Sequence, residues 1–214
     1  MFFLITGATA SGKSTYARLL PEYLTGVECH DADEMVTEDS DTRCAQLELW
    51  VQLALEAQGR GDHFVLTAHS PLGELLAAPS APGLDGIAAC LLDCPDPVRL
   101  ARIHGRGIDP RWPPTVHTFN WAAWHRRHAR DPRWLPHVID RNGPPTYRYD
   151  RWRTWTADDP RWHVYVLDTS SLTPRQTAPI LLEWVELTRQ KPAALSPSTR
   201  WWEPARLAPL VSSQ

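Results

Sequence analysis

The residues with the clearest chemical meaning lie near the start of the chain, in the stretch GATASGKST. Residues 7–14 fit the pattern G-x-x-x-x-G-K-[ST], in which backbone N–H groups of a tight loop surround phosphate oxygens. The lysine of this pattern neutralises phosphate charge, and the hydroxyl after it can bind Mg²⁺, here through Ser14. The pattern predicts a loop for ATP and Mg²⁺ that comprises Gly7, Ala8, Thr9, Ala10, Ser11, Gly12, Lys13, Ser14 and Thr15.

The lysine of this loop stands out against the rest of the chain. Of 22 basic residues only Lys13 and Lys191 are lysines, and the other 20 are arginines. A compact ammonium on a flexible stem fits between two phosphates, whereas a planar guanidinium fits poorly. The lysine at this position therefore strengthens the prediction beyond the pattern itself.

The segments around the loop predict the elements that must position it. The apolar run 2–6 predicts a buried strand before the loop, and residues 13–24 predict a helix after it, which Pro21 ends or kinks. Alternating strands and helices of this kind predict a parallel sheet with right-handed crossovers. Further strands are expected within 26–34 and at 63–68, 86–94 and 162–170. Further helices are expected at 41–59, with Asp41 as the N-cap, and after Ser70, with Ser70 as the N-cap and Pro71 as the first helical residue. Two more helices are expected after Cys94 and at 173–190.

Residues 99–162 interrupt this alternation. They contain 13 arginines, six aspartates and no glutamate, a local net charge of +7, together with seven tryptophans and five histidines. The sequence DPRW occurs at 109–112, 131–134 and 159–162, with unequal spacings that exclude a structural repeat. Two interpretations are open: each Asp caps a helix that begins at Pro with Trp packed inward, or the arginines flank an anionic site and stack on the tryptophans.

The overall composition limits the classes of protein to consider. A chain of 214 residues with 43% hydrophobic residues suits one globular domain, and a net charge of −3 favours neither nucleic acid nor a membrane globally. No run of 18 apolar residues predicts a membrane span, and the start MFFLITGA reads as a strand and not as a signal peptide. The four cysteines form no C-x-x-C, so we expect reduced thiols, no cysteine metal site and a cytoplasmic protein.

Motor and switch proteins that hydrolyse nucleotides have features that are missing here. Their phosphate loop is usually paired with a strand that ends in an acid, but the strand at 63–68 continues as His69 and Ser70. The strand at 86–94 offers Asp93, which we interpret as a turn former before the following prolines. The guanine-binding pattern N-K-x-D is absent. The sequence therefore favours transfer of the phosphate over its hydrolysis.

Five stretches in order resemble the small P-loop kinases: GATASGKST, HDADE, VLTAHSP, CPDPVRLARIHGRG and VLDTSSLTP. This group includes nucleotide, gluconate, shikimate and adenylylsulfate kinases and the chloramphenicol phosphotransferase type. The resemblance covers about residues 1–104 and 162–190. It implies a three-layer α/β P-loop fold with a parallel five-stranded sheet of order 2-3-1-4-5. It also implies a mobile, arginine-bearing lid after the fourth strand.

The same resemblance implies roles for individual residues. An acid after the second strand contacts the acceptor hydroxyl in many such kinases, which makes Asp31 and Asp33 the candidates. We favour Asp33 as the residue that contacts the acceptor. One alternative gives Asp31 a role on Mg²⁺ through a water molecule, and another places both acids in a solvated acidic loop. Arginines of the lid hinge stabilise the transferred phosphate, with a weaker second set at 126, 127 and 130. The resemblance assigns a catalytic role to Arg102 and Arg106. It places His69 and Ser70 near the acceptor, although Ser70 is alternatively a helix cap. It places Asp168 and Thr169 near the adenine.

We predict one P-loop kinase-like domain over residues 1–190. It includes an enlarged lid at 105–159, whose tryptophans form a small satellite core. A Pro- and Ser-rich tail follows at 191–214, which is either loosely held or docked on the body through the sequence RWWEPARL. The predicted function is ATP-dependent transfer of the γ-phosphate to a hydroxyl of an unidentified small molecule. Two alternatives are a kinase of nucleotides or polynucleotides, bound through the lid, and a nucleotide-regulated binding protein.

Overall fold

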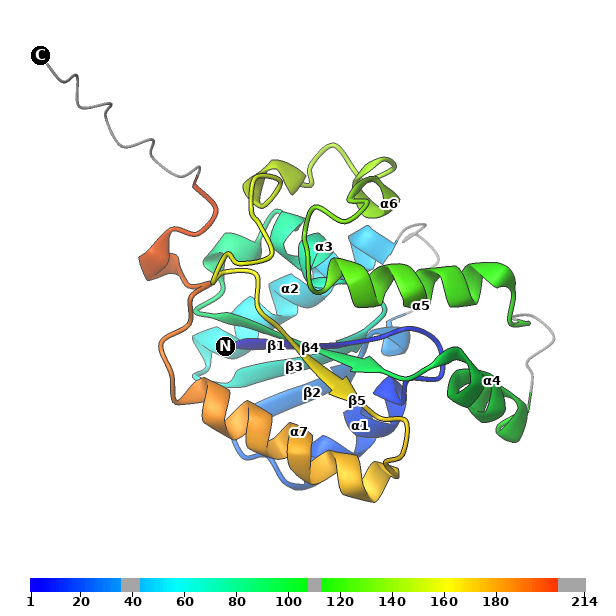
Figure 1. Cartoon of the computed structure of the whole chain (residues 1–214). Helices are drawn as coiled ribbons and strands as arrows, with labels where there is room; N and C mark the ends of the chain where they lie inside the picture. The colour runs from blue at the N-terminus through cyan, green and yellow to red at the C-terminus, as the bar shows by residue number, and fades with distance from the viewer. Residues whose placement is uncertain (36–42, 108–112, 204–214) are drawn as a thin grey trace, which may run out of the picture.

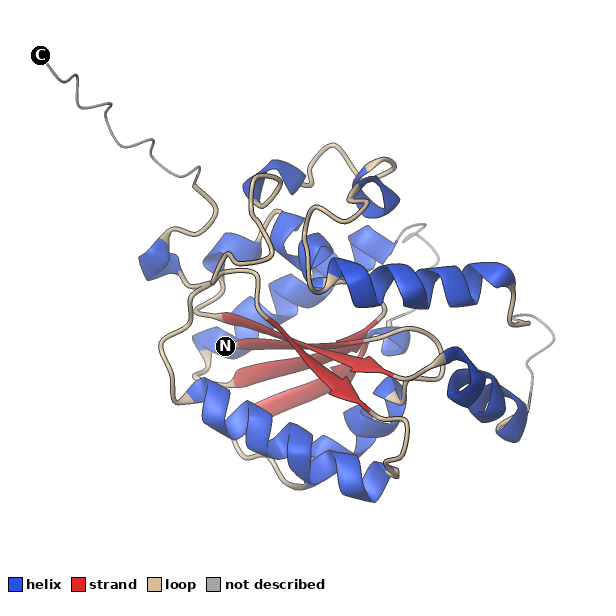
Figure 2. Cartoon of the chain, in the orientation of Figure 1, coloured by secondary structure: helices blue, strands red, loops and turns tan. Residues whose placement is uncertain are grey.

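The computed structural model describes residues 1–35, 43–107 and 113–203, and its centre is a five-stranded parallel sheet (Figure 2). The strand order is β2-β3-β1-β4-β5, which confirms the predicted fold class. The central strand β1 is fully buried, as its uninterrupted apolar sequence FFLIT requires in a sheet that is covered on both faces. The strands are β1 (Phe2–Thr6), β2 (Val27–Asp31), β3 (His63–Ala68), β4 (Ile87–Asp93) and β5 (Val164–Asp168).

Helices form a layer on each side of this sheet (Figure 1). The helices α1 (Lys13–Leu19) and α7 (Pro174–Arg189) enclose a largely aliphatic core cluster on one face. The opposite face is covered by α2 (Arg43–Gly59), α3 (Leu72–Ala77) and α5 (Val116–His128), and α4 (Asp96–Gly105) and α6 (His137–Asp140) lie beside these layers. The described part of the chain contains no helix long and apolar enough to cross a membrane. The short 3-10 helices are Leu20–Glu22, Ala32–Glu34, Ala81–Gly83, Tyr149–Arg151 and Pro197–Thr199.

Two predicted helix boundaries differ from the structure, and a third is not described. The helix α1 ends at Leu19, because Pro21 places the next residues in a 3-10 turn. The predicted cap at Ser70 is wrong: Pro71 occupies the N-cap position of α3 without a side-chain cap bond, and the carbonyl of Ser70 accepts a hydrogen bond from the Thr6 hydroxyl at 2.7 Å. The proposed cap Asp41 lies outside the described residues.

The tryptophans of the insertion belong to the main core. Trp124, Trp152, Trp155 and Trp162 share one cluster with Phe2 of the central strand, so the prediction of a separate satellite core is wrong. The Trp152 indole donates to the carbonyl of Gly73 at 2.8 Å, and a Cβ at Gly73 would lie 2.9 Å from the Trp152 ring. The insertion is therefore packed against α3 as part of the second helical layer.

The segment after α7 is also docked on the body. Leu195 and Trp201 are buried in the same core cluster, and the carbonyl of Leu195 accepts a hydrogen bond from the Ile87 N–H at 3.0 Å. Of the two alternatives for the tail, docking on the body is the one that holds within residues 191–203 and the loosely held one is wrong there, and residues 204–214 lie outside the described part. Large aromatic side chains outweigh the Pro- and Ser-rich composition here because each removes a large apolar area from water.

Two of the DPRW sequences form the same turn. In each, the Asp side chain accepts a hydrogen bond from the backbone N–H of the Arg, at 2.9 Å in 131–134 and at 3.0 Å in 159–162. The backbone N–H of the Trp donates to the backbone carbonyl of the same Asp. No helix begins at either Pro, so that part of the first interpretation is wrong, although Trp162 does pack inward. Stacking also occurs, since Arg127 lies 4.6 Å from the Trp134 ring and Arg161 4.1 Å from the Trp155 ring. The copy at 109–112 is outside the described residues.

Candidate active site

The glycine-rich loop joins β1 to α1 and has a strained, compact backbone. Gly12 has φ of 107° and Ala10 has φ of 60°, both in the left-handed region. A Cβ at Gly7 would lie 2.6 Å from the Leu92 carbonyl, so only glycine fits between the loop and β4. Strain of this kind persists where a loop must present its backbone N–H groups in one direction.

The loop forms a pocket of about 170 Å³ at the carboxyl edge of the sheet. Every described residue that lines it is one that the sequence analysis named as a site residue. Residues from three further segments complete the wall that the loop begins. The lining is Thr9, Ala10, Gly12, Lys13, Ser14, Thr15, Asp33, His69 and Arg106. We call this cavity the phosphate pocket.

The groups in this pocket fit a bound polyphosphate. Lys13 is buried, and its ammonium donates to the carbonyl of Ala8 at 3.2 Å. Burial lowers the pKa of Lys13 to about 8, opposed by the carboxylates of Asp31 and Asp33. The buried Ser11 hydroxyl has no hydrogen-bond partner in the described part of the chain, but it lies beside Gly7 and outside the lining of this pocket. The buried ammonium is the group that phosphate oxygens would satisfy.

A second cavity of about 150 Å³ adjoins the phosphate pocket, and we call it the acceptor pocket. Asp33 and His69 line both cavities, so they stand where the two contents would meet. Ser70 lies in the acceptor pocket as well, which brings together three of the four residues that the sequence assigned to the acceptor. The lining is Ala32, Asp33, Arg43, Gln46, Leu47, Trp50, Leu66, Ala68, His69 and Ser70.

The two acids after β2 differ in what they do. Asp31 caps the short helix that follows: its carboxylate accepts from the Asp33 N–H at 3.2 Å, and the Glu34 side chain accepts from the Asp31 N–H at 3.1 Å. Asp33 instead opens toward both pockets. Partial burial raises the pKa of Asp33, the neighbouring Asp31 raises it further, and Lys13 opposes both. Asp33 is therefore the carboxylate at the junction, and its pKa is raised.

His69 lies in a cationic environment. The Lys13 ammonium, together with burial, holds the pKa of His69 well below its usual value. The imidazole is consequently neutral at physiological pH and can both donate and accept a hydrogen bond.

The acceptor pocket contains residues that the sequence analysis missed. Arg43 forms a bidentate ion pair with the fully buried Glu74, with Nε–Oε2 at 2.8 Å, and lies 4.6 Å from the ring of Trp121 in the insertion. The indole Nε1 of Trp50 is buried without a hydrogen-bond partner among the described residues. The partners of Arg43 come from α3 and α5, so no local sequence signal could have indicated them.

The two arginines of α4 and Arg106, which follows the helix directly, have different positions. Arg99 is fully buried and donates to the carbonyls of Thr9 at 2.5 Å and Cys94 at 3.1 Å. Arg102 donates to the hydroxyl of Thr169 at 3.0 Å and to the carbonyl of Ala10 at 3.5 Å. Only Arg106 lines the phosphate pocket. Arg99 and Arg102 thus brace the glycine-rich loop from outside.

Asp93 is bound by arginines at the end of β4. Its carboxylate accepts from Arg126 at 3.0 Å and from Arg99 at 3.4 Å, and the Asp93 carbonyl accepts from the Thr169 N–H at 2.8 Å. Asp93 therefore joins the insertion to the segment that braces the phosphate loop.

Asp168 ends β5 and Thr169 follows it, and both lie outside the described linings of both pockets. Asp168 is exposed, and its carboxylate accepts from the Ser170 N–H at 2.8 Å. Their predicted position near an adenine stays a prediction, as does the catalytic role of Arg102. Of the second arginine set, Arg126 pairs with Asp93, Arg127 stacks on Trp134 and Arg130 is exposed, so none is among the described residues of the phosphate pocket.

Metal-binding groups are sparse within residues 1–35, 43–107 and 113–203. In those ranges no three or more His, Cys, Asp or Glu side chains are grouped to hold a metal ion, and the four cysteines are free. The half-buried Ser14 of the phosphate pocket is the residue that would hold Mg²⁺ together with the phosphates.

Comparison with solved structures finds kinases of low sequence identity. The chain is similar to an unliganded sugar kinase from Janibacter sp. HTCC2649, with a TM-score of 0.53 and 17% identity over 88% of this chain and 96% of that one. It also aligns with a putative kinase from Chloroflexus aurantiacus, with a TM-score of 0.49 and 14% identity over 90% and 97% of the two chains. The chain matches no family model and no curated protein. The first similarity shows a shared fold.

Proposed function

We propose that the protein is an ATP-dependent phosphotransferase that passes the γ-phosphate of ATP to a hydroxyl of a small molecule. The observation that carries this proposal is the pair of adjoining pockets that share Asp33 and His69. Such an arrangement has a place for the nucleotide phosphates and a separate place for a second molecule, with a carboxylate between them. The name of the Janibacter neighbour, a sugar kinase, agrees with a hydroxyl acceptor.

Each residue at the junction has a physical role in this reaction. Bound ATP with Mg²⁺ supplies the phosphoryl group. Lys13 and Arg106 neutralise phosphate charge in the phosphate pocket, and Ser14 would hold the metal. Asp33, whose pKa is raised by partial burial, accepts the proton of the acceptor hydroxyl. Neutral His69 keeps that hydroxyl in line with the phosphate.

The size and chemistry of the acceptor pocket favour a molecule with a single ring or a short polyol. A cavity of this volume, about 150 Å³, holds a benzene ring in another protein. The Trp50 indole and the Arg43 guanidinium offer donors to oxygen atoms of the acceptor. The pocket is too small to enclose a nucleotide, which favours the small-molecule reaction over nucleotide phosphorylation.

The arginines of the insertion give little support for a polynucleotide acceptor. Several of them are bound within the chain, since Arg148, Arg153 and Arg161 pair with aspartates and Arg151 donates to the carbonyls of Leu76 and Ala78. A surface that follows a phosphate backbone needs free cations. A regulated binding protein, the third possibility, would have no use for a carboxylate between two pockets.

The test is transfer of label from γ-labelled ATP with Mg²⁺ to pooled acceptors: sugars, polyols, nucleosides, nucleotides, hydroxylated antibiotics and a short oligonucleotide. Asp33→Asn should reduce transfer by about 10²- to 10⁴-fold, the usual contribution of a general base, with ATP affinity within about twofold. Asp85→Asn, an exposed carboxylate elsewhere on the surface, is the matched control and should leave transfer unchanged. Full activity of Asp33→Asn would refute the assignment of the base.

A further inference from the structure

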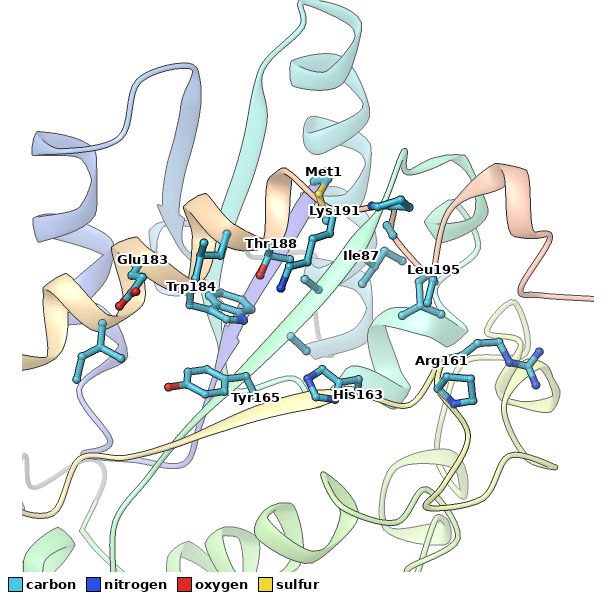
Figure 3. A pocket seen from close by; sticks show the side chains of 18 residues that line it. Met1, Ile87, Arg161, His163, Tyr165, Glu183, Trp184, Thr188, Lys191 and Leu195 are labelled. Carbon is cyan, nitrogen blue, oxygen red and sulfur yellow. The ribbon is translucent and has the colours of Figure 1, made fainter.

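A third cavity lies at the opposite end of the sheet from the phosphate loop (Figure 3). Its volume is about 490 Å³, which is in the range of small-molecule binding sites. Met1 lines it, whereas the phosphate loop begins at Gly7, so the length of β1, about 16 Å at the usual rise per residue, separates the two. A ligand here would not reach the proposed active site, and the inference does not depend on the proposed function.

The walls of this cavity are mostly apolar and are fixed in place. They come from α7, from the amino ends of β4 and β5 and from the segment after Lys191. The Trp184 ring packs against Phe3 at 5.6 Å between centroids and stacks with Tyr165 at 6.2 Å. The segment after Lys191 is held by the hydrogen bond from Ile87 to Leu195 and by Ala193, whose Cβ leaves no room for a side chain at Gly86. Fixed walls of this kind lower the entropic cost of binding.

One cation is directed into this apolar space. Figure 3 shows the Lys191 side chain pointing into the cavity between Thr188 and Ile87. No described residue forms an ion pair with Lys191. Arg161 at the rim is neutralised by Asp159, and Figure 3 places Glu183 at the far end, beyond Trp184. In a chain with only two lysines, one lies in the phosphate pocket and the other in this cavity.

We propose that this cavity is a second binding site, for a small, flat and largely apolar molecule that carries one anionic group. The ring system of the ligand lies against Trp184 and Ile87, where it removes apolar area from water. Its anionic group pairs with the Lys191 ammonium, with the Thr188 hydroxyl as a further donor. An unpaired cation at one side of an apolar cavity selects such a molecule over a neutral one of the same shape.

Two probes of nearly the same shape test this proposal: 1-anilinonaphthalene-8-sulfonate and its uncharged parent, N-phenyl-1-naphthylamine. Fluorescence titration of the full chain should show tighter binding of the sulfonate. Lys191→Met should weaken the sulfonate at least tenfold and change the neutral probe less than twofold, while Lys191→Glu should weaken the sulfonate further. Ala88→Trp, which fills the cavity, should weaken both probes. Arg175→Met, an exposed cation elsewhere on α7, is the matched control and should change neither.

Two results would overturn the proposal. One is equal sulfonate affinity in the wild type and in Lys191→Met, which would place the probe elsewhere. The other is displacement of the sulfonate by saturating ATP, which would place it in the phosphate pocket. Because Lys191 is exposed on one side, its variants should fold even if Ala88→Trp does not, and they decide the question alone.

Discussion

The phosphate pocket and the acceptor pocket adjoin at Asp33 and His69, yet they are built in different ways. Most of the phosphate pocket comes from one continuous loop, with Asp33, His69 and Arg106 as the only lining residues from elsewhere in the described part of the chain. The acceptor pocket is assembled from the segment after β2, from α2 and from the end of β3. It is further braced by Glu74 of α3 and Trp121 of the insertion. The phosphate pocket, one half of the site, depends on local sequence, and the acceptor pocket, the other half, depends on tertiary packing.

Lys13→Met, which alters the phosphate pocket, should have the largest effect. Loss of a charge-stabilising donor predicts a fall in transfer of about 10³-fold, with loss of ATP binding. The change should also stabilise the protein without nucleotide, because lowering the pKa of Lys13 from 10.5 to about 8 corresponds to about 3 kcal/mol of unfavourable burial at pH 7. Thermal unfolding without nucleotide measures this.

The pH dependence of stability gives a check on that interpretation. The unfolded wild type binds more protons than the folded protein between about pH 8 and 10.5, so its stability should rise with pH across that interval. Lys13→Met should lose this rise. A variant that melts below the wild type at pH 7 would contradict the account.

Glu74→Gln should affect the acceptor half alone. It leaves the Arg43 guanidinium without its ionic partner, and because Arg43 is 39% exposed the cost should be about 2 kcal/mol, below that of a fully buried pair. We expect kcat/KM for the acceptor to fall about 30-fold while ATP affinity stays within twofold. Steady-state kinetics with each substrate varied in turn measures both. Glu56→Gln, on the exposed side of α2, is the control, and an equal loss of ATP affinity would show that the halves are not independent.

The two halves should also differ in their response to pH. ATP binding requires the charged form of Lys13, and the pKa of Lys13 in the protein without nucleotide is about 8. ATP affinity should therefore fall about tenfold between pH 7 and 9. The acceptor KM should stay constant over the same interval, because the lowered pKa of His69 leaves it neutral there. Calorimetric titration with ATP measures the first and kinetics the second. Unchanged ATP affinity at pH 9 would contradict the role of Lys13.

Trp50→Phe should have the smallest effect. It removes the unpaired indole N–H from the acceptor pocket, and loss of one hydrogen bond of about 1 kcal/mol should raise the acceptor KM about fivefold. The KM for ATP should not change. Trp184→Phe, in the separate cavity at the other end of the sheet, is the matched control. An unaltered acceptor KM would mean that Trp50 only shapes the wall.

The difference between the two pockets also explains what sequence could predict. The apolar runs and the glycine-rich loop are local signals, so they were sufficient to predict the buried strands and the phosphate-binding loop, whereas the sheet order was implied by the resemblance to the small P-loop kinases. Asp33 and His69 were implied by the same resemblance, which agrees with the rule that ligands bind at the carboxyl ends of parallel strands. The role of Glu74 could not be predicted, because it depends on the ion pair with Arg43, which reaches Glu74 from another helix.

The errors have the same origin. Composition predicted a loose tail and a satellite core, but Trp152 and Trp201 find apolar partners that lie far away in the sequence. Ser70 has the residue type of a helix cap, yet its carbonyl is bound to Thr6 and Pro71 takes the cap position. Residue type alone could not reveal these competing contacts.

The burial of Trp201 has a consequence for the order of events during synthesis. When a growing chain has left the ribosome as far as α7, all five strands of the sheet are available to pair. The aromatic face around Trp155 still lacks its last indole, because Trp201 packs edge-on against Trp155 in the finished protein. Nascent chains at this stage expose the apolar surface that Trp201 later covers. Completion of the core must therefore wait for the segment that also closes the cavity around Lys191.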